Sequence, residues 1–231
     1  MDRTVPKGAA ILLDFVRKTE TGRSDRASYD VIYGHKQGKL AKPITSMTLD
    51  EVVAAQSTWS HHHGSSAAGG YQFIRKTLRG LVAELGLRGS QRFDPDLQDR
   101  LAWHLLKRRG YDKFMSGRMT KTEFAKQLAC EWASFPVLQG TQGQKRYVAR
   151  GQSYYAGDGL NKALVEPRAI ESLLDRVSAI SDHPEPPAPS IPQPPAEPER
   201  EHTAKQGRSI APLVIFLTIA AIVGAASYLG L

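Results

Sequence analysis

Apolar side chains recur at helical spacing along the first 180 residues, and capping residues mark where several of the helices should begin. The predicted helices cover residues 6–19, 49–57, 74–85, 95–110, 124–133 and 167–180. Thr48 and Thr120 each stand three residues before a Glu, the capping-box pattern, and Asp94 precedes a proline suited to a first turn. Residues 29–34 alternate aromatic and β-branched side chains, which predicts a short strand or extended loop. The expected fold class is therefore α+β, mainly helical, with one small extended element.

The pattern changes after residue 181. Residues 182–198 contain eight prolines and no apolar face, so we expect an extended linker that continues to residue 209. Residues 210–231 carry no charge and are long enough as a helix to cross a hydrocarbon core of about 30 Å. The predicted organisation is a folded domain (1–181), a linker (182–209) and a transmembrane helix. Basic residues precede this span and none follows it, which predicts a membrane-anchored protein with its domain in the cytoplasm.

The net charge of +8 is concentrated in the predicted domain, which alone carries +10. Such a domain is drawn to polyanions: nucleic acid, anionic lipid or the acidic polymers of a bacterial envelope. Nucleic acid is not expected as a partner, because no helix-turn-helix or zinc signature is present. Cys130 lies in an apolar helical context and is expected to be a buried core thiol. The histidines at 61–63 are expected in a polar loop, since consecutive side chains point in different directions, and neither a metal nor a cofactor is predicted.

Glu20 lies at the expected end of the first helix, two residues before Gly22. Unpaired carbonyl groups place partial negative charge there, so the pKa of a carboxyl group at this position should rise. A Glu that keeps its proton near neutral pH can act as a general acid. The same position also fits a solvated glutamate at a helix end.

Two further stretches have the character of a sugar-binding surface. Small residues at 65–70 allow close approach of a ligand, and Tyr71 and Gln72 after them offer a stacking face and an amide for sugar hydroxyl groups. Residues 137–159 are rich in Gly, Gln and Tyr, including Tyr147, as loops that line carbohydrate grooves often are. A glycine hinge and an ordinary polar loop fit these stretches as well.

Four stretches together resemble the bacteriophage lambda-type endolysins, which are lysozyme-fold peptidoglycan lytic transglycosylases. In chain order they are Glu20 with Gly22, Tyr-Asp-Val-Ile at 29–32 with Gly34, Ala-Gly-Gly-Tyr-Gln at 68–72, and Trp-Ala-Ser-Phe-Pro at 132–136. The resemblance runs over about residues 8–178. The chain departs from the lambda pattern in Thr21, which separates a Glu and a Gly that are adjacent there, in a longer segment after Gly34, and in its C-terminal extension.

This resemblance implies cleavage of the β-1,4 bond between N-acetylmuramic acid and N-acetylglucosamine, with Glu20 as the catalytic residue. Glu20 would protonate the glycosidic oxygen and then accept the proton of the muramic acid 6-hydroxyl, which closes a 1,6-anhydro ring. The candidate substrate-binding residues are Asp30, Tyr71, Gln72, Ser134 and Tyr147.

The sequence also leaves alternatives open for the reaction, for the role of Asp30 and for catalysis itself. Hydrolysis stays open, with Asp25 or Asp30 as the second carboxylate, and Asp30 could instead hold its loop by hydrogen bonds. A non-catalytic peptidoglycan-binding membrane protein is also compatible with the sequence. Besides peptidoglycan glycan strands, the expected partners are the membrane, reached through the C-terminal helix, and a holin-like protein that releases the domain.

Overall fold

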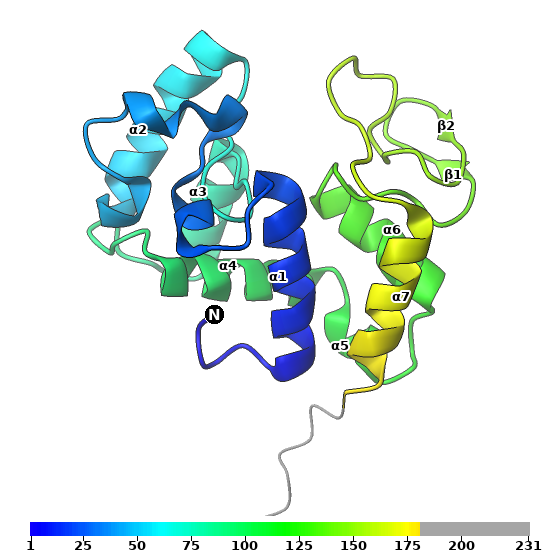
Figure 1. Ribbon diagram of the computed structural model, residues 1–231. Helices are drawn as coiled ribbons and strands as arrows, with labels where there is room; N and C mark the ends of the chain where they lie inside the picture. Colours follow the sequence, from blue (N-terminus) through cyan, green and yellow to red (C-terminus); the bar gives the residue numbers. More distant parts are fainter. Residues whose placement is uncertain (181–231) are drawn as a thin grey trace, which may run out of the picture. The chain divides into compact units, whose positions relative to one another are not determined.

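The computed structural model describes residues 1–180, so the predicted linker and the predicted span at 210–231 lie outside the described residues (Figure 1). Seven α-helices lie within the described residues: α1 (Lys7–Thr21), α2 (Leu49–His63), α3 (Arg75–Glu84), α4 (Pro95–Arg108), α5 (Tyr111–Met115), α6 (Lys121–Glu131) and α7 (Pro167–Ser178). Short 3-10 helices occupy Arg26–Asp30, Tyr33–Lys39 and Ile44–Ser46. Strands β1 (Thr141–Gln142) and β2 (Tyr147–Val148) pair antiparallel, with Thr141 opposite Val148.

The capping residues predicted from the sequence are confirmed, as are the starts of α2 and α4, whereas α6 begins at Lys121, three residues before its predicted start. Thr48 and Thr120 each accept a hydrogen bond from the backbone of the Glu three residues on, and that Glu side chain accepts one in return, which satisfies amide groups that the helix leaves unpaired. The Asp94 side chain accepts a hydrogen bond of 2.8 Å from the backbone N–H of Leu97. Local sequence therefore sets where α2, α4 and α6 begin.

The small extended element is not where it was predicted. Residues 29–34 form parts of two 3-10 helices, and only an isolated bridge between Ile32 and Ala68 has strand pairing there. The left-handed backbone of Gly34 and His35, with φ of 66° and 57°, turns the chain at that point. The two-stranded sheet lies at 141–148 instead, within a region predicted to be loop, because two-residue strands are too short to show an alternating pattern.

Helix α2 runs to His63, six residues beyond the predicted end. No Gly or Pro interrupts the segment before Gly64, which caps the helix with a left-handed φ of 75°. The prediction that the histidines at 61–63 form a polar loop is therefore wrong.

Helix α1 is packed against α4 and α7 (Figure 1). Its apolar face is fully buried through Leu12, Leu13 and Val16, each worth about 1.5–3 kcal/mol relative to exposure. The rings of Phe15 and Phe135 form a T-shaped pair, with ring centroids 5.8 Å apart. This packing fixes the C-terminal end of α1, where Glu20 lies, against the segment that follows α6.

The predicted transmembrane helix and the membrane-anchored, cytoplasm-facing localisation are corrected here. No helix in the described residues is long and apolar enough to cross a membrane. The longest, α1 and α2, have 15 residues each, whereas a bilayer core requires about 20 apolar residues.

Candidate active site

The last turn of α1 carries Glu20 and ends in a tight cap. Gly22 adopts a left-handed φ of 68°, and its N–H donates to the carbonyl of Lys18 at 2.9 Å. Thr21 belongs to the helix and is buried, and its hydroxyl donates to the carbonyl of Arg17 at 2.7 Å. The residue inserted between Glu and Gly therefore lengthens the helix, and Glu20 stays within its last turn.

Ser134 connects Glu20 to the segment after α6. The Ser134 hydroxyl donates a short hydrogen bond to Oε1 of Glu20, and only 6% of Ser134 is exposed. Its own backbone carbonyl accepts from the N–H of Leu164 at 2.8 Å. Two segments 114 residues apart in the chain thus meet at one carboxyl group.

The pKa of Glu20 is raised to about 7, chiefly because burial removes the carboxylate from water. The hydrogen bond from Ser134 acts in the opposite direction, since it stabilises the ionised form. The direction of this shift agrees with the sequence prediction, but the main cause is burial rather than the partial charge at the helix end. Glu20 can therefore both give and take a proton near neutral pH.

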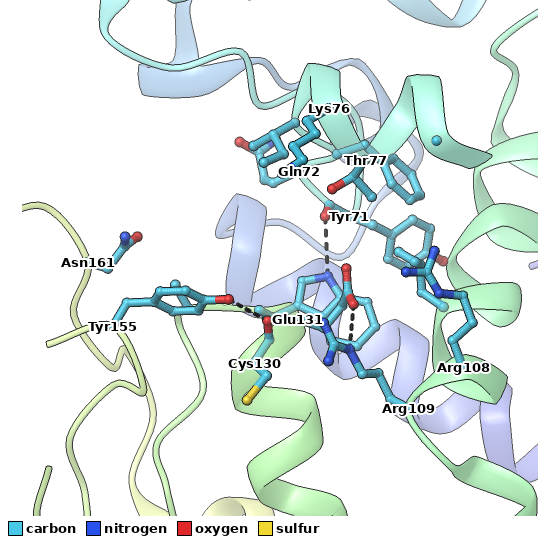
Figure 2. A pocket seen from close by; sticks show the side chains of 16 residues that line it. Tyr71, Gln72, Lys76, Thr77, Arg108, Arg109, Cys130, Glu131, Tyr155 and Asn161 are labelled. Carbon is cyan, nitrogen blue, oxygen red and sulfur yellow. Dashed lines mark hydrogen bonds and ion pairs between the residues drawn. The ribbon is translucent and has the colours of Figure 1, made fainter. Parts of the chain in front are cut away.

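A groove runs past Glu20 in two contiguous parts. The first, here called the Glu20 pocket, has a volume of about 350 Å³, and Tyr33, His35 and Gln72 are among its lining residues. The second, here called the groove extension, has a volume of about 570 Å³ and lies between α3, the end of α4 and the end of α6 (Figure 2). Both parts are lined by Gln72, Ile74, Glu131, Trp132, Ala133 and Asn161.

Gln72 is held rigidly where the two parts meet. Its backbone has a left-handed φ of 49°, which is uncommon for a residue other than glycine. Its amide nitrogen donates to the carbonyls of Gly69 at 2.8 Å and Val31 at 3.2 Å. These bonds fix the side chain at the wall of the groove before any ligand binds.

A comparison with protein-family models matches the chain to the Endolysin family over residues 10–160, which is more than half of its length. The chain belongs to the endolysin family. No curated protein and no solved structure matches it. Membership makes the chain a phage-type enzyme that cleaves peptidoglycan and lyses the cell wall, in agreement with the resemblance seen in its sequence.

Only part of the predicted site comes together in the endolysin. Glu20 and Gln72 line the Glu20 pocket, and Ser134 bonds directly to Glu20. Asp30 is not among the groove-lining residues, and its Oδ1 accepts a hydrogen bond of 2.9 Å from the backbone of Thr45, which holds the loop.

Of the two tyrosines predicted to bind substrate, Tyr71 lines the groove extension but is almost fully buried, and Tyr147 lies outside the groove. Tyr71 is 1% exposed, and its hydroxyl donates to Oδ1 of Asp99 at 2.5 Å, so the core rather than the groove takes most of its ring. Tyr147 is 63% exposed on β2 and does not line either part of the groove. The small residues before Tyr71 serve the same core, because Gly69 packs on Gln98 and Gly70 on Arg17.

Sequence reasoning missed several groove residues. Glu131, the last residue of α6, accepts a hydrogen bond of 2.7 Å from Nε of Arg109. Like Glu20, Glu131 is a glutamate at a helix end, and it directly precedes the Trp-Ala-Ser segment. Its position in the sequence could therefore have identified it as a candidate groove residue. Asn161 carries no such signal. Cys130 is half-buried and lines the groove extension, and burial raises the pKa of its thiol.

Metal ligation has no candidate cluster in the part of the chain that the structure describes. No three His, Cys, Asp or Glu side chains among those residues are arranged to hold an ion.

Replacing Ser134 by Ala is expected to move the pH profile of the endolysin to higher pH. Without the hydroxyl donor the carboxylate of Glu20 is less stabilised, so the pKa of Glu20 should rise further above about 7. The alkaline limb of kcat/KM, which follows loss of the Glu20 proton, should shift in the same direction. Profiles of the wild type and the variant on purified sacculi check this, and a shift to lower pH would contradict the assignment.

Proposed function

We propose that this endolysin is a lytic transglycosylase, which cleaves the β-1,4 bond between N-acetylmuramic acid and N-acetylglucosamine and leaves 1,6-anhydro ends. The observation that carries the proposal is Glu20, a partly buried acid with a pKa of about 7 at the wall of a groove. A group in that state supplies the proton that a departing glycosidic oxygen needs.

The other candidate carboxylates already have ion-pair or hydrogen-bond partners within the protein. Retaining and inverting hydrolases need a second carboxylate about 5–9.5 Å from the first. Asp25 is exposed and forms an ion pair with Arg23, and Asp30 holds its loop. Glu131 does line the groove, but its Oε2 is bound by Arg109. A reaction in which the substrate supplies its own nucleophile fits this arrangement best.

The proposed reaction uses Glu20 twice. Protonated Glu20 donates to the glycosidic oxygen as the bond from C1 of the muramic acid breaks and positive charge develops on the ring. The Glu20 carboxylate then accepts the proton of the 6-hydroxyl while O6 bonds to C1, which returns Glu20 to its starting state. The Ser134 hydroxyl stabilises the carboxylate between the two steps.

A hydrolytic muramidase is the second candidate, and Glu131 is the observation in its favour. Glu131 shares the Glu20 pocket with Glu20, and a substrate that drew Arg109 away would leave its carboxylate free to activate water. A holin-like release partner forms no part of either proposal, because it was expected from a membrane anchor.

Mass spectrometry of the fragments released from purified sacculi separates the two candidates. The transglycosylase reaction adds no water, so each muropeptide should carry a 1,6-anhydro end and be lighter by one water than its hydrolytic counterpart. Reducing ends in the initial products would instead assign the endolysin as a muramidase.

A further inference from the structure

The groove extension carries an excess of positive charge. Lys76 on α3, Arg108 at the end of α4 and Arg109 directly after it line this cavity, and Glu131 is the one carboxylate among its described lining residues. Figure 2 shows Lys76 and the two arginines approaching the cavity from different sides, with Glu131 between them. Such a lining favours a ligand that brings negative charge.

Two of the three cations are available to a ligand. Arg109 is engaged, since it donates to Oε2 of Glu131 at 2.7 Å and thereby neutralises that carboxylate. Arg108 is exposed and lies 3.3 Å from Glu84, a surface ion pair of the kind that contributes little. Lys76 is exposed, and no carboxylate of the described residues lies within ion-pair distance of it. Lys76 and Arg108 can therefore take new carboxylate partners at small cost.

The extension also has room for a peptide. Gly80 lies in the middle of α3 and lines the cavity, and a Cβ added to it would meet no heavy atom within 4 Å. Glycine inside a helix costs about 0.5–1 kcal/mol relative to Ala, so helix propensity does not favour it at this position. The half-buried ring of Tyr155, which also lines the cavity, offers apolar surface.

We propose that the groove extension binds the peptide stem of the muramic acid through the free carboxylates of that stem. This inference rests on the proposed function for the identity of the ligand. Because the extension shares six lining residues with the Glu20 pocket, its occupant should belong to the strand bound at Glu20. The sugar backbone carries no charge where the lactyl carboxyl group of the muramic acid is joined to a stem as an amide. The stem carries free carboxylates, so in such a strand only the stem matches Lys76 and Arg108.

Binding of soluble glycan strands to the full chain carrying Glu20→Gln tests this inference without any cleavage. One strand preparation keeps its peptide stems. In the other, an amidase has removed the stems, and the lactyl carboxyl groups that this exposes have been converted to amides, so that its sugars carry no charge. We expect the stem-bearing strands to bind about tenfold more tightly, which corresponds to about 1.4 kcal/mol. Adding Lys76→Glu and Arg108→Glu should reduce the ratio of the two Kd values to about one. Equal Kd values before these changes, or an unchanged ratio after them, would overturn the inference.

Two further variants separate the site from general charge effects. Arg79→Glu reverses an exposed charge on the same helix that does not line the extension, so it should keep the tenfold ratio. Gly80→Leu fills the cavity without changing charge and should lower the ratio. Loss of the ratio in Arg79→Glu, or its retention in Gly80→Leu, would count against the stem site. Because the readout is a Kd, a failure of the proposed reaction leaves this result interpretable.

Discussion

Replacing Glu20 by Gln is expected to lower lytic activity by about 10²–10⁴-fold while the fold stays intact. Gln is nearly isosteric with Glu and can still accept the hydrogen bond from Ser134, but it can neither donate a proton to the glycosidic oxygen nor accept one from the 6-hydroxyl. Loss of turbidity of purified sacculi measures the activity, and circular dichroism checks the fold. Activity within a fewfold of the wild type would refute the role of Glu20.

The same variant should gain stability at high pH. The folded-state pKa of Glu20, about 7, lies above the ordinary value of 4.5 for a glutamate, so the native state binds this proton more tightly than the unfolded state. The resulting stability is fully present below about pH 4.5 and is lost as the pH rises through about 7. Relative to wild type, Glu20→Gln should therefore be more stable at about pH 8 than at about pH 4, by up to about 3 kcal/mol. Urea unfolding at both pH values measures the difference, and a pH-independent difference would mean that Glu20 ionises normally.

Replacing Asp99 by Ala is expected to lower the free energy of unfolding by about 2–6 kcal/mol, since two buried hydroxyl groups lose their acceptor at about 1–3 kcal/mol each. Asp99 is fully buried, and its Oδ1 accepts from Tyr29 at 2.9 Å and from Tyr71 at 2.5 Å. Its Oδ2 accepts from the backbone N–H of Asp2 at 2.7 Å. Chemical denaturation measures the loss.

Asp99→Asn is the matched control. Its amide oxygen can still accept from the two tyrosines while its charge is removed, so it should lose less stability than the Ala variant. Equal losses in both variants would show that the charge and the Oδ2 bond to Asp2, both of which Asn lacks, stabilise this cluster more than the bonds from the two tyrosines do. Because Tyr71 directly precedes Gln72, the Ala variant should also loosen the wall of the groove.

The parts of the site that could be predicted from the sequence are those that local rules determine. The end of α1 was recognisable from its apolar spacing and Gly22, and the position of Glu20 followed from it. The capping boxes set the starts of α2 and α6. Ser134 had no local signal and was found only through the resemblance of its segment to lambda-type endolysins.

The parts of the site that could not be predicted from the sequence depend on contacts between segments that are distant in the chain. Tyr71 was predicted to face substrate because tyrosines stack on sugars, but Asp99, 28 residues further along the chain, accepts its hydroxyl in the core. The charges of the groove extension come from three helices, and neither hydrophobic periodicity nor capping residues report which ends of those helices meet. Sequence reasoning thus found the acid and missed most of the groove around it.

Digestion of purified sacculi in water enriched in oxygen-18 tests the central claim most directly, namely that Glu20 directs the 6-hydroxyl of the substrate, rather than water, to the broken bond. The account predicts 1,6-anhydro products that contain no heavy oxygen, and no products from Glu20→Gln. One oxygen-18 atom in each new reducing end would contradict it.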